Sequence, residues 1–383
     1  MEQEVEKKTG GDRVIWAVVI ILSLFSILSV YSTSGILVIR NPGNNAAYFV
    51  IRHAIFIIIG LGTIYFIQRI PYRYFSRASQ WMVIISIPLL LATLFFGKNV
   101  NQASRWLELL PIIGLSFQTS DFAKLALIMY VARQLSQKQN DIKDFYKGFL
   151  PVIIPIGIVC LLILPEHLSS ALILLISCTV LMFIGRVNTK HLLLVGAGAI
   201  LVMGIFVAIA RLTDRETRVG TWQSRINNFI ESDGENYQVE QAKIAIAGGG
   251  LFGKFPGNST QRNFLPYSYS DFIYAVIIEE YGLIIGGIPI LLLYLILLYR
   301  AGVIVRKSTR TFPAFLAIGL TTGMVLQAMV HMAVAVNLIP VTGQPLPFVS
   351  MGGTSMIITS INLGIILSVS RGIGEHQINE SQE

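Results

Sequence analysis

The chain contains ten apolar runs that are each close to the length needed to cross a lipid bilayer. A transmembrane helix requires about 20 predominantly apolar residues. Such runs occur near 14–34, 47–68, 80–97, 120–137, 148–164, 168–186, 190–210, 271–299, 312–337 and 350–370. Only 13% of the 383 residues are charged, which is about half of the fraction usual in a soluble domain. The sequence therefore predicts an all-α integral membrane protein, built as a bundle of about ten transmembrane helices.

Lysines and arginines are divided unequally between the segments that join these runs. With the N-terminus inside, the inner segments carry most of them, whereas the short outer segments carry only Arg40, Arg52, Lys98 and Arg105. The positive-inside rule then places both tails, 1–13 and 372–383, in the cytoplasm and the membrane domain over 14–371. Because topology accounts for the net charge of +8, no nucleic-acid partner is expected.

One outer segment, residues 211–270, is far longer than the others and is expected to fold back on the outer mouth of the bundle. Within it, Gly248–Lys254 has the GxxxxGK spacing of a phosphate-binding loop. Phe255 stands where a Ser or Thr hydroxyl would hold magnesium, so the segment is not expected to bind a nucleotide. Two interpretations remain open: a plain tight turn, or a phosphate contact through backbone N–H groups beside Lys254.

Acidic residues interrupt the eighth apolar run, which opens with Asp271 and contains Glu279 and Glu280. Carboxylates within a membrane span are costly and usually face a polar cavity that serves function. On a continuous helix Glu279 lies about 12 Å from Asp271, beyond the roughly 5–9.5 Å that separates glycosidase carboxylates. A two-carboxylate hydrolase is therefore disfavoured. Asp271 can act alone as a general base, with Glu279 and Glu280 in structural or lysine-pairing roles.

Two further segments carry charge near the predicted outer surface. Lys124 falls about one turn inside the fourth run, behind Asp121 in the expected first helical turn. Its ammonium either snorkels outward or points into the bundle towards a carboxylate or a phosphate. Arg105 and Trp106 either bind a lipid phosphate at headgroup level or are ordinary interfacial anchors.

Small residues and prolines fill the last outer segment, 342–355. This composition favours a re-entrant or broken segment that lines a cavity, although a surface turn is the simpler alternative. The five histidines are scattered, without metal-ligand spacing. Cys160 and Cys178 lie in apolar runs and predict no disulfide framework.

Taken together, these motifs resemble the SEDS family (shape, elongation, division, sporulation) over essentially the whole chain. The resemblance is carried by Asn258–Gln261, Phe264–Pro266, Ser270–Ile273, Glu279–Gly282, Ala103–Trp106, Gln118, Lys124, Thr342–Gly343 and Leu346–Ser355. The forms of Ala103–Trp106 and Gly257–Ser259 are closer to the division members than to the elongation members. The chain departs from the family pattern at Asp121, where glutamate is common, and at Phe255, where glycine is common.

The resemblance implies a peptidoglycan glycosyltransferase that polymerises lipid II outside the cytoplasmic (inner) membrane, enriched at the division septum. It implies undecaprenyl-pyrophosphate-linked glycan as a substrate. The implied partners are a class B penicillin-binding protein transpeptidase and other divisome membrane proteins. A lipid II flippase and a non-catalytic division scaffold remain the alternatives.

The same resemblance implies a catalytic role for Asp271 as general base. It implies substrate contacts for Arg52, Arg105, Trp106, Gln118, Lys124, Lys254, Ser259, Gln261, Glu279, Glu280 and Ser350. The leaving pyrophosphate needs cationic stabilisation, for which Lys124, Arg105, Arg52 and Lys254 are candidates. No cofactor is firmly implied, although a divalent cation, Mg²⁺ or Mn²⁺, could assist.

Overall fold

A computed structural model describes residues 11–40, 43, 45–100, 103–110, 115–212, 229 and 237–380. Each of the ten predicted runs coincides with helix, which confirms the all-α membrane fold. The helices are α2 (Arg13–Arg40), α3 (Ala46–Ile67), α4 (Arg73–Phe96), α5 (Thr119–Gln137), α6 (Leu150–Ile163), α7 (Leu168–Ile184), α8 (Thr189–Leu212), α11 (Ile273–Gly282) with α12 (Ile288–Lys307), α13 (Thr311–Ala335) and α14 (Gly353–Glu380).

Within the described residues, seven helical segments are long and apolar enough to cross a membrane. The apolar parts of α7 and α8 are shorter. Helix α5 is less apolar because it carries Asp121, Lys124 and Arg133. Charge in a membrane helix is tolerated where it faces the bundle interior, so α5 is expected to be a central helix.

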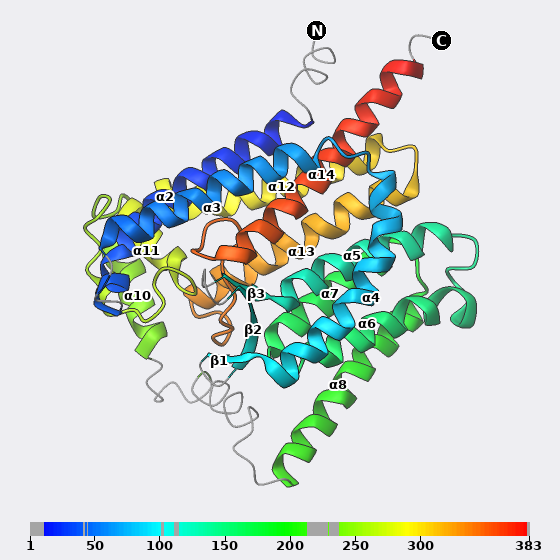
Figure 1. Ribbon diagram of the computed structural model, residues 1–383, viewed down its shortest axis with the longest axis horizontal. Coiled ribbons are helices and arrows are strands. Elements are labelled where there is room, and N and C mark those ends of the chain that lie inside the picture. Colours follow the sequence, from blue (N-terminus) through cyan, green and yellow to red (C-terminus); the bar gives the residue numbers. More distant parts are fainter. Residues whose placement is uncertain are drawn as a thin grey trace.

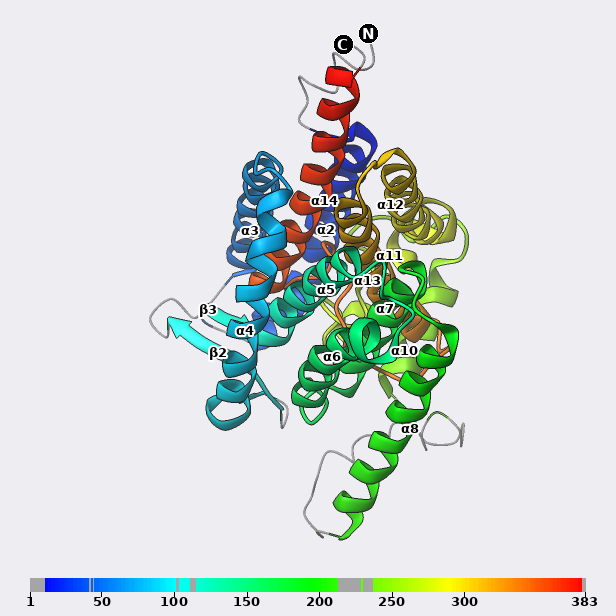
Figure 2. The same ribbon diagram turned by 90° about the vertical axis from the view of Figure 1, so that its right-hand side faces the viewer.

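Helices α5 and α13 indeed occupy the centre of the bundle (Figure 1). Helix α13 packs against α5, α7, α12 and α14, and α5 also contacts α4 and α6. In α13, 61% of the most apolar stretch is buried, compared with 22% in α3. Helix α3 therefore presents most of its apolar surface to lipid, whereas α13 forms the core. Helix α8 extends away from the bundle in both views (Figures 1 and 2).

The first turn of α2 and the last turns of α14 lie at one end of the bundle, here called the terminal end (Figure 1). An ion pair between Arg300 and Asp12 joins α12 to the start of α2 there. Trp16 Nε1 donates to Gln68 Oε1 over 3.1 Å, which places the α3–α4 turn at the same end.

A small antiparallel sheet lies at the opposite end, between α4 and α5. It has the order β1 (Lys98–Val100), β2 (Ala103–Leu110) and β3 (Leu115–Gln118), with Trp106 opposite Gln118. The apolar-run analysis did not predict this sheet, because its strands are short and lack a long apolar period.

The eighth predicted span, 271–299, is not one continuous helix. Gly282 has φ 75°, a conformation that favours glycine, and a π-helical turn, η3 (Leu283–Gly287), follows it. Helix α11 begins at Ile273, so Asp271 lies in the preceding turn and not inside the helix. The predicted loop 211–270 also contains a helix, α10 (Tyr237–Gly249), which packs against α11.

Candidate active site

Asp271 is half-buried in the turn that leads into α11. Its backbone N–H donates to Tyr267 O over 3.0 Å, which fixes the turn. A Cβ placed on Gly343 would lie 3.6 Å from Asp271 Oδ2. The carboxylate therefore lies directly against the segment that joins α13 to α14.

That segment, residues 341–352, is a buried re-entrant loop, which confirms the cavity-lining interpretation over the surface turn. Leu346, Phe348 and Val349 are almost completely buried. Buried backbone carbonyls need hydrogen-bond partners. The partners are side chains of the surrounding helices: His331 for Gln344 O, Gln327 for Pro345 O, Tyr294 for Pro347 O and Ser26 for Val349 O.

Ser350 joins the re-entrant loop to the Asp271 turn. Its hydroxyl donates to Ser270 O over 2.7 Å and accepts from Leu346 N over 2.8 Å. Met351 N donates to Tyr269 O over 3.0 Å alongside it. Because the bonds to Ser270 O and Tyr269 O end on the two residues before Asp271, Ser350 and Met351 set the position of the catalytic candidate. A direct contact between Ser350 and substrate stays a prediction.

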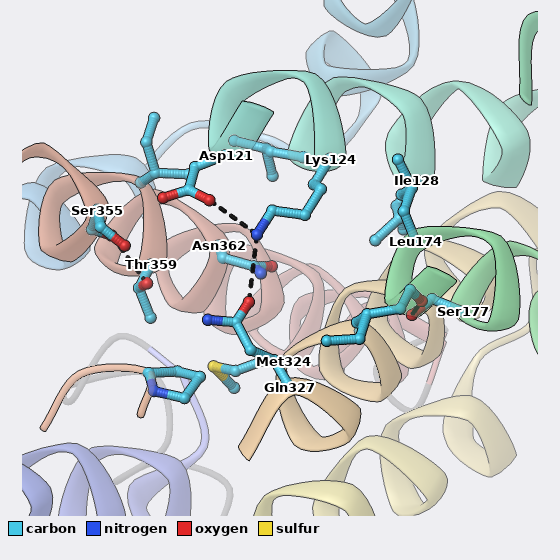
Figure 3. A pocket seen from close by; sticks show the side chains of 15 residues that line it. Asp121, Lys124, Ile128, Leu174, Ser177, Met324, Gln327, Ser355, Thr359 and Asn362 are labelled. Atoms are coloured by element: carbon cyan, nitrogen blue, oxygen red, sulfur yellow. Dashed lines mark hydrogen bonds and ion pairs between the residues drawn. The ribbon is translucent and has the colours of Figure 1, made fainter. Parts of the chain in front are cut away.

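Lys124 points into the bundle (Figure 3). Its Nζ lies 2.7 Å from Asp121 Oδ1 and 3.3 Å from Gln327 Oε1. The three side chains line a cavity of about 60 Å³ between α5, α7, α13 and α14, with Pro347 of the re-entrant loop in its wall. A cavity of that size holds a few water molecules. The inward alternative for Lys124 is the one observed.

Two hydrogen-bond acceptors that line this cavity have no partner among the described residues. Among the described residues, Asp121 Oδ2 and Asn362 Oδ1 are buried without a hydrogen-bond partner, which is rare in native proteins and points to a missing ligand or water. Gln327 connects the cavity to the re-entrant loop, since its Nε2 donates to Pro345 O over 3.0 Å. The sequence analysis missed Gln327 and Asn362, although an amide inside an apolar run was the available signal.

The loop 254–261 encloses the side chain of Glu279, which lies on α11. It is completely buried, and five donors of the 254–261 segment converge on its carboxylate: Lys254 Nζ at 2.8 Å, the Ser259 hydroxyl, the Thr260 hydroxyl at 2.9 Å, and the backbone N–H groups of Thr260 and Gln261. These contacts give Glu279 a structural role, and a substrate contact of Glu279 stays a prediction. Both carboxylate oxygens are already engaged in holding the loop onto α11.

The neighbouring Glu280 is also buried but points towards α2. The Ser32 hydroxyl donates to Glu280 Oε1, and Ser259 N lies 3.4 Å from the same oxygen. Arg262 reaches Ser32 O over 3.0 Å from the loop side. Glu280 therefore fastens α2 to α11, as the structural alternative predicted, and a substrate contact of Glu280 stays a prediction.

The glycine-rich segment Gly248–Lys254 serves backbone packing. A Cβ on Gly249 would lie 2.2 Å from Ile278 O, and one on Gly253 would lie 2.2 Å from Glu280 O. Lys254 N donates to Glu279 O over 2.9 Å, and Leu283 N donates to Gly250 O over 3.0 Å. The glycines thus allow a main-chain contact beside the break at Gly282, which favours the tight turn over the phosphate contact.

The other residues predicted to contact substrate lie in different parts of the structure. Gln118 ends β3, and its side-chain amide lies 3.1 Å from Ser120 Oγ. Arg52 is half-buried near the start of α3. The side chains of Arg105 and Trp106 lie outside the described residues. Ser259 is buried under Glu279, as is the Gln261 Oε1 atom.

The structure thus brings Asp271, Ser350 and Lys124 into one connected region, while Lys254, Ser259 and Gln261 form a separate clamp. In the described part of the chain, no three His, Cys, Asp or Glu side chains are grouped closely enough to hold a metal ion. Assistance by a divalent cation stays a prediction.

The chain matches a family model described as cell cycle protein, which covers FtsW, RodA and SpoVE, over residues 12–373. It is 34% identical to the probable peptidoglycan glycosyltransferase FtsW of Trichlorobacter lovleyi, covering 94% of this chain and 93% of that one. It is 30% identical to stage V sporulation protein E of Bacillus subtilis, covering 95% and 98%.

Solved structures have the same fold. A chain from a study of how a peptidoglycan synthase complex coordinates polymerization and crosslinking superposes with a TM-score of 0.73 at 22% identity, over 95% of this chain and 98% of that one. The rod shape determining protein RodA of Thermus thermophilus gives 0.67 at 24%, over 94% and 97%. The chain therefore belongs to the FtsW/RodA/SpoVE family of cell cycle proteins, the SEDS family.

Proposed function

We propose that this protein is a peptidoglycan glycosyltransferase that polymerises lipid II during cell division, with Asp271 as the general base. Asp271 accepts the proton of the 4-hydroxyl of the N-acetylglucosamine of an incoming lipid II. The hydroxyl oxygen attacks the anomeric carbon of the growing glycan, the bond to pyrophosphate breaks, and the anomeric centre inverts. Undecaprenyl pyrophosphate leaves with the electron pair of that bond.

One observation carries this assignment: the Asp271 carboxylate lies against a rigid re-entrant loop that is hydrogen-bonded to the Lys124 cavity through Gln327. A general base must be held in place relative to the reacting hydroxyl. The bonds from Ser350 to Ser270 O and from Met351 to Tyr269 O supply that positioning.

Lys124 is the best-placed described cation for the pyrophosphate. Its Nζ lies in the cavity beside the re-entrant loop, which also contacts Asp271. Lys254 is less suited, because Glu279 and Thr260 already hold its ammonium group. Arg105 and Arg52 remain proposed contacts. No step is assigned to a divalent cation.

The membrane placement belongs to the same proposal. The excess of basic residues at the terminal end favours a cytoplasmic location for both termini, with Asp271 facing outward. The partners proposed are a class B penicillin-binding protein transpeptidase and other division membrane proteins at the septum. The relationship to a peptidoglycan synthase complex supports a transpeptidase partner.

The test is to incubate the purified protein with labelled lipid II, with and without its cognate transpeptidase, and to resolve the products on a gel. A glycan ladder that disappears in Asp271→Ala supports the proposal. A ladder that persists in that variant contradicts the assignment of Asp271. Translocation of lipid II in vesicles without glycan growth would establish a flippase instead. The absence of both polymerisation and translocation would indicate a scaffold.

A further inference from the structure

A second polar cavity lies at the terminal end of the bundle, far from Asp271. It has a volume of about 370 Å³ and is enclosed by the α3–α4 turn, the start of α13 and α14. Four of the residues that line it are arginines: Arg69, Arg73, Arg310 and Arg371. None of its lining residues is acidic. Nothing in the proposed polymerisation chemistry uses this cavity.

Three of the four arginines in this pocket have no carboxylate partner among the described residues. Arg69, Arg73 and Arg310 form no ion pair with any carboxylate in the part of the chain that the structure describes. Like charges gathered around one cavity repel each other, and an opposite charge between them relieves that repulsion. The pocket therefore favours an anionic occupant.

Tyrosine rings contact two of the four arginines, and α14 packs against the α3–α4 turn. The Arg69 guanidinium lies 4.0 Å from the centroid of the Tyr65 ring and hydrogen-bonds the Tyr65 hydroxyl, and that of Arg73 lies 5.2 Å from the Tyr74 ring. A Cβ on Gly372 would lie 2.8 Å from the Tyr72 ring, so α14 is pressed against the α3–α4 turn. These contacts restrain two of the four guanidinium groups and the α14 wall, which lowers the entropic cost of binding there.

The surroundings distinguish between possible anions. The planar guanidinium group matches the geometry of a phosphate better than an ammonium group does. Apolar side chains are exposed next to the pocket: Phe66 at the end of α3 is 67% exposed, and Ile70 in the α3–α4 turn is 41% exposed. An occupant with a phosphate and hydrocarbon chains satisfies both surfaces.

We infer that the arginine pocket binds the phosphate of an anionic phospholipid in the leaflet at the terminal end. The guanidinium groups contact the headgroup, and the acyl chains lie along the exposed apolar faces of α3 and α4. Basic pockets between transmembrane helices are suited to such headgroups. Binding there would tie the ends of α3, α4, α13 and α14 to the membrane surface.

The test measures lipid retention by native mass spectrometry of the full-length protein, offered phosphatidylglycerol and phosphatidylcholine at equal concentration. The variant is Arg73→Gln/Arg310→Gln, and Arg310→Gln alone guards against misfolding because Arg310 is exposed in a turn. Arg77→Gln is the matched control, since Arg77 lies one turn from Arg73 on α4 but does not line the pocket. A parallel sample contains excess inorganic phosphate.

The wild-type protein should prefer phosphatidylglycerol, and each arginine removed should lower that preference about five-fold, equivalent to about 1 kcal/mol. Arg77→Gln should leave the preference nearly unchanged. Equal losses in the pocket variant and in Arg77→Gln would overturn the inference, because general surface charge would explain them. Thermal stabilisation by inorganic phosphate without preferential lipid retention would overturn it as well.

Discussion

Among the described residues, two lysine–carboxylate pairs have buried carboxylates but differ in what surrounds them. In the first, Lys254 and Glu279 are joined by three further residues of the same loop, and both oxygens of the carboxylate are engaged. In the second, Lys124 and Asp121 line a cavity, and Asp121 Oδ2 has no partner within the described residues.

The comparison shows that a charge pair in a membrane protein does not by itself identify a substrate site. A carboxylate that the protein satisfies completely is a structural anchor, because a substrate would have to displace existing bonds to reach it. A pair that lines a cavity, as Lys124 and Asp121 do, has room for a ligand beside it. The difference separates the Lys124 region from the Lys254 region, although sequence reasoning treated both lysines alike.

The largest expected effect comes from removing the anchor. Glu279→Ala leaves the Ser259 and Thr260 donors without their acceptor, and each buried donor left unpaired costs about 1–3 kcal/mol. The melting temperature of the detergent-purified protein should fall strongly. Glu240→Ala on the neighbouring α10, where the side chain is exposed, should melt like the wild type. A Glu279→Ala protein of wild-type stability would contradict the anchoring role.

Replacing the cavity lysine should mainly lower the rate of lipid II polymerisation per folded molecule. Lys124→Met removes the charge proposed to stabilise the leaving pyrophosphate, and loss of one such interaction costs about 100-fold in rate. Lipid II polymerisation per folded molecule should therefore drop by about that factor, and the melting temperature should also fall because the buried Asp121 loses its ion-pair partner. The control is Lys143→Met, which alters an exposed lysine in the α5–α6 connection. Equal activity in both variants would remove Lys124 from the mechanism.

A smaller effect is expected for the link between the two parts of the site. Gln327→Leu removes the hydrogen bonds to Lys124 and to Pro345 O and leaves a buried carbonyl unpaired, at a cost of about 1–3 kcal/mol. Polymerisation should fall about ten-fold, since the re-entrant loop then positions Asp271 less well. Gln137→Leu, at the exposed end of α5, should have no effect on the rate.

The smallest effect concerns the loop beside the anchor. Phe255 has φ 70° and is 74% exposed, and the resemblance to the family indicates glycine at this position. Phe255→Gly relieves about 1–2 kcal/mol of left-handed strain, partly offset by the entropy of glycine, so the melting temperature should rise slightly. Phe252→Gly, at an exposed position without positive φ, should lower it.

Sequence reasoning reached the bundle and part of the site for identifiable reasons. Apolar length alone located the ten helical segments, and the cost of a charge in a span singled out Asp271, Lys124 and Glu279. It could not separate their roles, because the partners of Glu279 lie in a loop whose path depends on main-chain contacts between glycines and α11. It also missed Gln327, since one amide in an apolar run does not reveal which helices it joins.

The most direct test of the whole account compares two isosteric variants on one gel. Asp271→Asn and Glu279→Gln each remove one carboxylate charge, and lipid II polymerisation is measured per folded molecule alongside the melting temperature. The account predicts no glycan above background for Asp271→Asn at wild-type stability. It predicts near wild-type polymerisation for Glu279→Gln at reduced stability. Glycan synthesis by Asp271→Asn, or its complete loss in folded Glu279→Gln, would contradict the division between catalytic and anchoring carboxylates.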